Sequence, residues 1–215
     1  MEVTSEIFRQ VGRYCLDYDT YEADMLLEHL EEAFHKRRSI FIFGNGGSGS
    51  TASHFCEDVG KGTLRGLADE QRFKVISLTD NTPYILAWAN DSGYENVFEQ
   101  QLRNLAERGD VAIGISGSGN SENVLRAIRY ANSAGLVTVG MTGFDGGQLR
   151  RIANHCLHIP IHEMGIVESI HLIIIHYIVN SLKNRIHGGN GRPRIVNLEA
   201  HPKSATNGVA ALTSR

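Results

Sequence analysis

The sequence predicts an α/β fold in which a parallel sheet carries helices on both of its faces. Short uninterrupted apolar runs alternate along the chain with stretches of helical periodicity, as expected for strands that are buried on both faces. Two glycine- and serine-rich loops each follow such a run and lead into a helix-like stretch, where ligand loops of α/β folds lie. The chain has 215 residues, 41% of them hydrophobic, which fits one domain with a substantial core.

The elements follow in order from the N-terminus. Residues from about Ser5 to Arg37 predict one or two amphipathic helices, because apolar residues recur there at helical spacing. Five apolar runs predict the strands, at residues 39–43, 73–78, 110–115, 136–141 and 156–160. Helices are expected from near Ser48, over about 96–107, over 123–133 behind an N-cap at Ser121, and over 168–185 as a long apolar helix.

The domain organisation is simple. We expect residues 1–186 to form a single domain that includes the N-terminal helices. Residues 187–215 are expected to be a C-terminal tail, mobile or docked on a partner, because they hold a Gly-Gly-Asn-Gly segment, two of the four prolines and no helical period.

Composition restricts the partners and the compartment. The net charge of −3 is mild and no arginine-rich stripe occurs, which argues against nucleic acid. The first residues do not resemble a signal peptide, and the apolar run at 170–175 is short and contains His171, so no membrane partner is expected. Three distant cysteines, Cys15, Cys56 and Cys156, fit no disulfide framework, and we expect a reducing cytoplasm.

The two loops suggest an anionic ligand. The first, at 44–50, reads Gly-Asn-Gly-Gly-Ser-Gly-Ser, and the second, at 116–121, reads Ser-Gly-Ser-Gly-Asn-Ser. Glycines let a ligand approach the backbone closely, and hydroxyls and free N–H groups at a helix start suit an anion. A phosphomonoester fits the many hydroxyls. Two alternatives stay open: both loops are merely tight turns, or the first is a dinucleotide loop, although Asp80 comes later than the usual interval of about 20 residues.

Polar residues on two predicted helices are candidates for chemistry. His54 and Asp58 are four residues apart, so they share a helix face and can reach one divalent metal, although an exposed surface pair is the alternative. Glu168 and His176 are eight apart on the last helix, separated by about 80° around its axis, and can face one pocket. His171, on the same helix, is expected to be a satisfied core histidine.

Two further groups are less informative from sequence. His158 and His162 flank a proline and are expected to be ordinary loop residues. Asn90 and Asp91 follow the apolar run at 85–89, and they either face the pocket or cap a turn.

Together these stretches resemble the sugar isomerase (SIS) domain family, and within it the phosphoheptose isomerases. The resemblance covers about residues 8–182. The matching stretches are GNGGS at 44–48, HFCED at 54–58, ANDSGYEN at 89–96, GISGSGNS at 114–121, an altered LTVGMTGFDGG at 136–147 and ESIHLIIIH at 168–176. The resemblance implies a flavodoxin-like three-layer αβα sandwich with a five-stranded parallel sheet and additional N-terminal helices, assembled as a homotetramer with sites at subunit boundaries.

The resemblance also implies roles for individual residues. Substrate-binding positions would be Asn45, Gly46, Gly47, Ser48, Asp58, Asn90, Asp91, Ser116, Gly117, Ser118, Ser121 and Glu168, with the serines of the second loop on the phosphate. A zinc ion, one per subunit, would be held by His54, Asp58, Glu168 and His176. The chain departs from the family at three of these positions, where the family usually has Glu at 58, Gln at 168 and Thr at 117.

The expected function is that of an aldose–ketose isomerase acting on a sugar phosphate. The resemblance points to conversion of sedoheptulose 7-phosphate into D-glycero-D-manno-heptose 7-phosphate through an enediol, with Asp58 as base and His176 as acid. The alternative is a non-catalytic family member that binds a sugar phosphate or a replication initiator protein. Because binding-only relatives tend to lose the acid and the histidine of the last helix, the presence of Asp58 and His176 favours the enzyme.

Overall fold

The computed structural model describes residues 3–188, so the expected tail lies outside the described residues except for its first two positions. Five strands form one sheet in the order β2-β1-β3-β4-β5, and every neighbouring pair is parallel. The strands are β1 (Ser39–Gly44), β2 (Lys74–Ser77), β3 (Val111–Ser116), β4 (Val137–Thr142) and β5 (His155–His158). The prediction of a five-stranded parallel sheet is confirmed.

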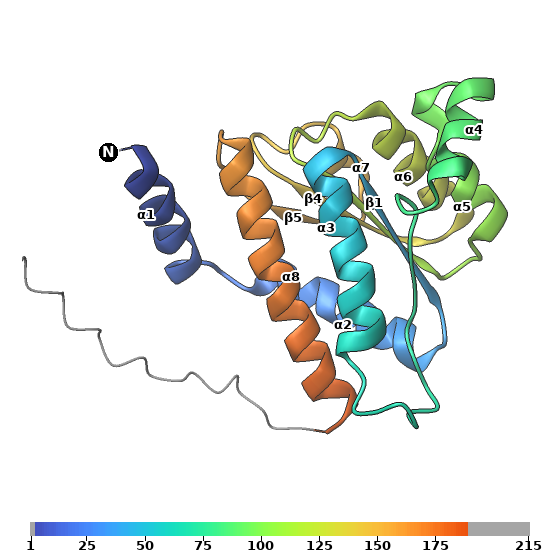
Figure 1. Ribbon diagram of the computed structural model, residues 1–215, viewed down its shortest axis with the longest axis horizontal. Coiled ribbons are helices and arrows are strands. Elements are labelled where there is room, and N and C mark those ends of the chain that lie inside the picture. The colour runs from blue at the N-terminus through green and yellow to red at the C-terminus, as the bar shows by residue number, and fades with distance from the viewer. Residues whose placement is uncertain (1–2, 189–215) are drawn as a thin grey trace, which may run out of the picture.

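Helices cover both faces of this sheet (Figure 1). One face carries α1 (Val3–Leu16), α2 (Tyr21–His35), α3 (Gly46–Glu57) and α8 (Met164–Ile186). The other face carries α4 (Thr82–Ser92), α5 (Glu99–Leu105), α6 (Glu122–Ala134) and α7 (Leu149–Ile152). Two short turns complete the described chain: the π-helical η1 (Asp58–Gly62) and the 3-10 turn η2 (Tyr94–Asn96). The three-layer αβα architecture is therefore confirmed.

Strand β1 shows why the sheet has two apolar faces. Side chains alternate between the faces of a strand, so Ile40 and Ile42 enter the core under α2, α3 and α8. Phe41 and Phe43 enter the second core, under α5 and α6. All four are at most 1% exposed. A strand buried on both sides needs the continuous apolar run that the sequence shows.

The strand order places both glycine-rich loops at one point. The chain leaves β1 toward β2 on one side, and β3 pairs with β1 on the other side, so the topology reverses between β1 and β3. Ligands of open α/β sheets bind at the carboxyl ends of strands where this reversal occurs. Gly44, at the end of β1, pairs in register with Ile115, and the second loop begins at the next residue. The two loops are therefore neighbours.

The structure corrects several expected boundaries. Helix α4 was not predicted, since its apolar run at 85–89 has no helical period; Pro83 in its first turn and the Asn81 cap, whose Oδ1 accepts from Tyr84 N at 3.3 Å, are the signals that mark it. The helix expected over 96–107 is instead η2 followed by α5, after Gly93 ends α4 with φ of 92°. Helix α7 was also missed, and it has only four residues.

Helix α8 is longer than expected and begins at Met164, because the Glu163 carboxylate caps it by accepting from Ile166 N at 2.7 Å. With 23 residues and a mean hydropathy of 1.5 over its most apolar window, it is long and apolar enough to cross a membrane. Half of that window is buried inside the protein, against the sheet and α2. Its apolar residues thus have partners within the fold, as in a core helix.

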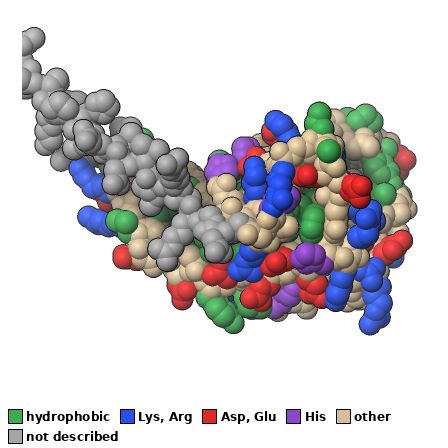
Figure 2. Space-filling model, turned by 90° about the horizontal axis from the view of Figure 1, so that it is seen from below, with side chains coloured by type: hydrophobic (Ala, Val, Ile, Leu, Met, Phe, Trp, Pro, Cys, Tyr) green, Lys and Arg blue, Asp and Glu red, His purple; other side chains and the backbone are tan. Residues whose placement is uncertain are grey.

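Charge is distributed evenly over the face drawn in Figure 2. Acidic and basic side chains alternate there without a continuous basic stripe. This agrees with the mild net charge of −3.

Candidate active site

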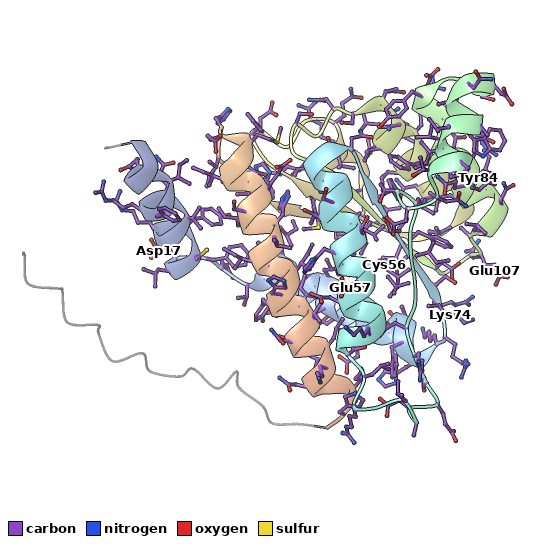
Figure 3. The ribbon with its side chains drawn as sticks, viewed as in Figure 1. Asp17, Cys56, Glu57, Lys74, Tyr84 and Glu107 are labelled. Carbon is purple, nitrogen blue, oxygen red and sulfur yellow. The ribbon has the colours of Figure 1, made fainter. Side chains whose placement is uncertain are left out.

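Two histidines and an aspartate from two helices meet on one face of the molecule. His54 lies in the last turn of α3, and Asp58 is the first residue of the π-helical turn that follows. His176 comes from α8, which runs beside α3; Figure 3 labels Cys56 and Glu57, the residues directly before Asp58. His54 Nε2 lies 3.0 Å from His176 Nε2 and 3.2 Å from Asp58 Oδ2. His176 Nε2 lies 3.7 Å from the same oxygen.

These three atoms fit the geometry of a zinc site. Zinc is bound tetrahedrally by imidazole nitrogens and carboxylate oxygens at about 2.0–2.2 Å, so neighbouring ligand atoms are separated by about 3.3 Å. The observed separations of 3.0, 3.2 and 3.7 Å lie around that value. Among the described residues, His54, Asp58 and His176 form the group whose donor atoms all lie within 4.8 Å of one another. A π-helical turn at Asp58 agrees with the frequent occurrence of such turns at functional sites.

Glu168, the fourth expected ligand, does not join this group. It lies two helical turns before His176, about 12 Å along α8. Its carboxylate instead lies against Gly47, where a Cβ on that glycine would come within 2.4 Å of Glu168 Oε1. Glu168 therefore contacts the first loop at the N-terminal end of α3, and its side chain fills the space that the glycine leaves.

The first loop borders a cavity of about 330 Å³. The cavity is lined by Gly44, Asn45, Gly46, Gly49, Ser50, Ser53, Thr79, Ile85, Tyr94 and Phe98. Ser48, an expected substrate contact, is instead 6% exposed and lies beneath the loop beside Gly44. Neither the serines of the second loop nor the His54–Asp58–His176 group lines this cavity.

Asn45 stands at the N-cap of α3 but does not cap it. Its side chain forms two reciprocal hydrogen bonds with that of Asn123: Asn45 Nδ2 donates to Asn123 Oδ1 at 2.9 Å, and Asn123 Nδ2 donates to Asn45 Oδ1 at 2.8 Å. The hydroxyl of Tyr94 donates to the same Asn45 oxygen at 2.8 Å. Sequence analysis did not single out Asn123 or Tyr94, although Tyr94 lies within the matched stretch at 89–96 and Asn123 lies just after that at 114–121, because no spacing of metal-ligand or acid–base residues marks them.

The second loop gathers three hydroxyls. Ser116 Oγ lies 3.1 Å from Ser121 Oγ and 3.5 Å from Ser118 Oγ. Ser121 occupies the N-cap of α6, as predicted, but its side chain makes no capping bond and turns toward Ser116 instead. Gly117 is covered by Met164 of α8, whose sulfur would lie 2.4 Å from a Cβ at that position. The loop is thus held between the sheet and the start of α8 with its hydroxyls together.

Asn90 and Asp91 lie apart from these groups. Both are exposed near the end of α4, and Asn90 Nδ2 donates to Asp91 Oδ1 at 2.7 Å. Neither lines the cavity at the first loop. In the described conformation they neither face that cavity nor cap α4, which ends at Gly93.

The core histidine prediction is confirmed. His171 is 1% exposed, and its Nε2 lies 3.2 Å from the carbonyl oxygen of Thr142. Burial lowers its pKa to about 4, so the ring is neutral at physiological pH.

The expectation that His158 is an ordinary loop residue is wrong. His158 ends β5, and its Nδ1 lies 3.0 Å from Thr142 Oγ1. Burial lowers the pKa of His158 as well.

Comparison with known proteins identifies the family. A family profile described as SIS domain matches residues 18–143. The phosphoheptose isomerase of Trichlorobacter lovleyi is 36% identical over 197 residues, which cover 87% of this chain and 99% of that one. This chain belongs to the SIS domain family. A second SIS relative, the phosphoheptose isomerase of Aquifex aeolicus, is 31% identical over 189 residues, covering 86% and 97% of the two chains.

Solved structures agree with this assignment. The phosphoheptose isomerase of Neisseria gonorrhoeae has a TM-score of 0.76 and 26% identity, covering 84% of this SIS chain and 95% of its own. That of Francisella tularensis has a TM-score of 0.77 at 22% identity and so supports the fold alone. The expectation of an isomerase-type enzyme is confirmed by these relatives.

Proposed function

We propose that this protein is an aldose–ketose isomerase that converts sedoheptulose 7-phosphate into D-glycero-D-manno-heptose 7-phosphate. The observation that carries the proposal is the approach of a carboxylate and an imidazole from separate helices, with Asp58 Oδ2 and His176 Nε2 only 3.7 Å apart. Relatives named phosphoheptose isomerase support the choice of substrate.

The reaction needs a base and an acid near adjacent carbons. Asp58 removes a proton from C1 of the ketose while His176 donates a proton to the carbonyl oxygen on C2, which gives the enediol. Return of the proton to C2 and loss of the hydroxyl proton on O1 give the aldehyde. No oxidant is needed, because C1 is oxidised as C2 is reduced. Groups 3.7 Å apart can serve neighbouring substrate atoms.

The hydroxyls of the second loop bind the phosphate in this proposal. Ser116, Ser118 and Ser121 offer hydroxyl donors to the phosphate oxygens, and the N-terminus of α6 adds the favourable end of a helix dipole. Asn45, Gly46 and Gly47 line the sugar side. Asn90 and Asp91 would reach the substrate only after a movement of α4, which has no buried residues to hold it.

The donor set fits a zinc ion held by His54, Asp58 and His176, and such an ion would compete with the proton-transfer roles of Asp58 and His176. When bound, the ion supplies Lewis-acid polarisation of the substrate oxygens. Glu168 becomes a fourth ligand only if its side chain leaves Gly47. We also propose cytoplasmic localisation, an assembly of four chains with sites at subunit boundaries, and a domain boundary near residue 186.

The test is turnover of sedoheptulose 7-phosphate by the wild type and by two variants, Asp58→Asn and His176→Ala. Each variant removes a proton-transfer group, so we expect kcat to fall by at least about 100-fold while the assembly state stays unchanged. Glu57→Gln is the matched control, because Glu57 is the adjacent, exposed carboxylate at the end of α3. Full activity in both variants would reject these roles, and an inactive wild type would reject the substrate.

A further inference from the structure

The side chains of two N-cap residues are diverted from the helices that they begin. Asn and Ser are preferred N-cap residues because their side chains accept hydrogen bonds from the first N–H groups of a helix. Asn45 before α3 and Ser121 before α6 make no such bond. Their side chains bond to Asn123 and Ser116 instead. The first N–H groups of both helices are therefore not taken by these caps.

The polarity of the Asn45 side chain is fixed by a chain of donors that starts at the backbone. The N–H of Val124 can only donate, and it donates to Asn123 Oδ1 at 3.0 Å. This bond identifies the oxygen of Asn123, so its amide nitrogen faces the oxygen of Asn45. That oxygen also accepts from the Tyr94 hydroxyl, and both of its lone pairs are used.

One N–H group of the Asn45 side chain remains without a hydrogen bond in the described structure. Its amide nitrogen carries two hydrogens, and one of them is bonded to Asn123 Oδ1. The other N–H is a donor, at a residue that lines the 330 Å³ cavity. The network thus makes Asn45 a donor toward a ligand oxygen and prevents it from acting as an acceptor.

We propose that Asn123 is a positioning residue for substrate binding. It acts through Asn45, by holding that side chain away from the α3 N-terminus and by presenting its free N–H to an oxygen of the sugar phosphate. Asn123 is suited to this role because it is only 3% exposed and joins the first loop to α6, directly behind the second loop. The proposal rests on the proposed function for its substrate, sedoheptulose 7-phosphate.

The first experiment measures KM and kcat for Asn123→Ala with sedoheptulose 7-phosphate. Asn45 is then free to cap α3 and compete with the ligand, so we expect KM to rise by about tenfold or more and kcat to change less. Tyr94→Phe removes one hydroxyl from a side chain that is 55% exposed, and we expect a smaller rise in KM, by about two- to fivefold.

A double-mutant cycle separates positioning from general structural damage. If Asn123 acts through Asn45, the variant Asn45→Ala/Asn123→Ala has the same KM as Asn45→Ala alone, because no side chain is left to be positioned. Asn132→Ala is the matched control: Asn132 lies on the same helix and donates to Ile152 O at 2.7 Å, away from the loops. We expect Asn132→Ala to lose comparable side-chain hydrogen bonds and to keep the wild-type KM.

Two results overturn the proposal: a wild-type KM in folded Asn123→Ala, or independent effects of the two substitutions in the double variant. If the wild type binds sedoheptulose 7-phosphate without isomerising it, the proposed function fails, and the same comparison is made with dissociation constants from calorimetry. If the dissociation constants of the variants follow the order expected for their KM values, the positioning role is supported. A wild-type affinity in Asn123→Ala, or no binding by the wild type, contradicts the positioning role.

Discussion

Single side chains decide the chemistry of this protein. The imidazole nitrogens of His54 and His176 lie 3.0 Å apart beside one aspartate oxygen, an arrangement that either shares a proton or binds a cation. The separations between these three atoms are close to those between neighbouring ligand atoms of a tetrahedral zinc site, which favours a bound cation over a shared proton. At the same scale, a buried neutral imidazole at His171 links protonation to stability.

The first prediction concerns metal content. We expect about one equivalent of zinc per purified chain, and we expect His54→Ala to lose it on dialysis because two remaining ligands hold zinc poorly. Elemental analysis measures both. His162→Ala is the control, because His162 is exposed and its ring lies against that of Phe144, away from the proposed ligands. Full zinc retention by His54→Ala would contradict the assignment.

The second prediction concerns acid stability. The pKa of His171 is about 4 in the folded state, below the ordinary value of 6.5, so the unfolded chain binds the proton first as pH falls. The contribution to stability is complete above pH 6.5 and is lost progressively toward pH 4. Between pH 7 and pH 5 this amounts to roughly 2 kcal/mol of unfolding free energy.

Urea unfolding at the two pH values measures this loss. His171→Gln keeps a donor for the Thr142 carbonyl but cannot titrate, so we expect its stability to fall by about 2 kcal/mol less than that of the wild type over this range. An equal loss in both proteins would show that other groups control the acid transition.

At the scale of elements, α8 holds the loops in place. Three of its side chains contact glycines after three different strands: Met164 lies on Gly117, Val167 on Gly143 and Glu168 on Gly47. Residues at this spacing lie on one helix face. The second loop also depends on Gly119, whose φ is 66° and whose Cβ position lies 2.0 Å from the Gly146 carbonyl oxygen.

The third prediction compares two glycines in the second loop. In Gly119→Ala, an alanine must adopt the left-handed backbone conformation, and its Cβ collides with the backbone carbonyl of Gly146. We therefore expect the free energy of unfolding to fall by at least about 2 kcal/mol. For a chain of this size, that lowers the thermal midpoint by roughly 4–8 °C. Gly117→Ala meets only the flexible end of Met164 and should lower it much less. Equal shifts in calorimetry would show that backbone conformation does not control this loop.

At the scale of the whole molecule, apolar side chains remain exposed around α1. Phe8 is 74% exposed, Leu16 87% and Tyr21 67%. Exposed apolar side chains such as these are candidates for an interface between chains. In the described chain, neither the serines of the second loop nor the His54–Asp58–His176 group lines the cavity at the first loop, which agrees with the proposed assembly with sites at subunit boundaries.

The fourth prediction concerns assembly. Sedimentation velocity should give a mass about four times the 23.7 kDa of one chain. Phe8→Glu places a charge on the exposed face of α1, so we expect smaller species and reduced isomerase activity together. Leu67→Ser, at a 91% exposed loop residue, is the control and should leave the assembly intact. A wild-type monomer with full activity would contradict sites at subunit boundaries.

The sequence alone determined the sheet, its two covered faces and the positions of the two glycine-rich loops, because these depend on local apolar periodicity and on the conformational freedom of glycine. It also placed His54 and Asp58 together, since they share one helix. Only the tertiary structure decided that Glu168 lies on Gly47 and that Asn123 holds Asn45, and it brings His176 beside His54 and Asp58, which only the family resemblance had implied. Such contacts depend on how separate helices pack, and distances between them leave no periodic signal in the chain.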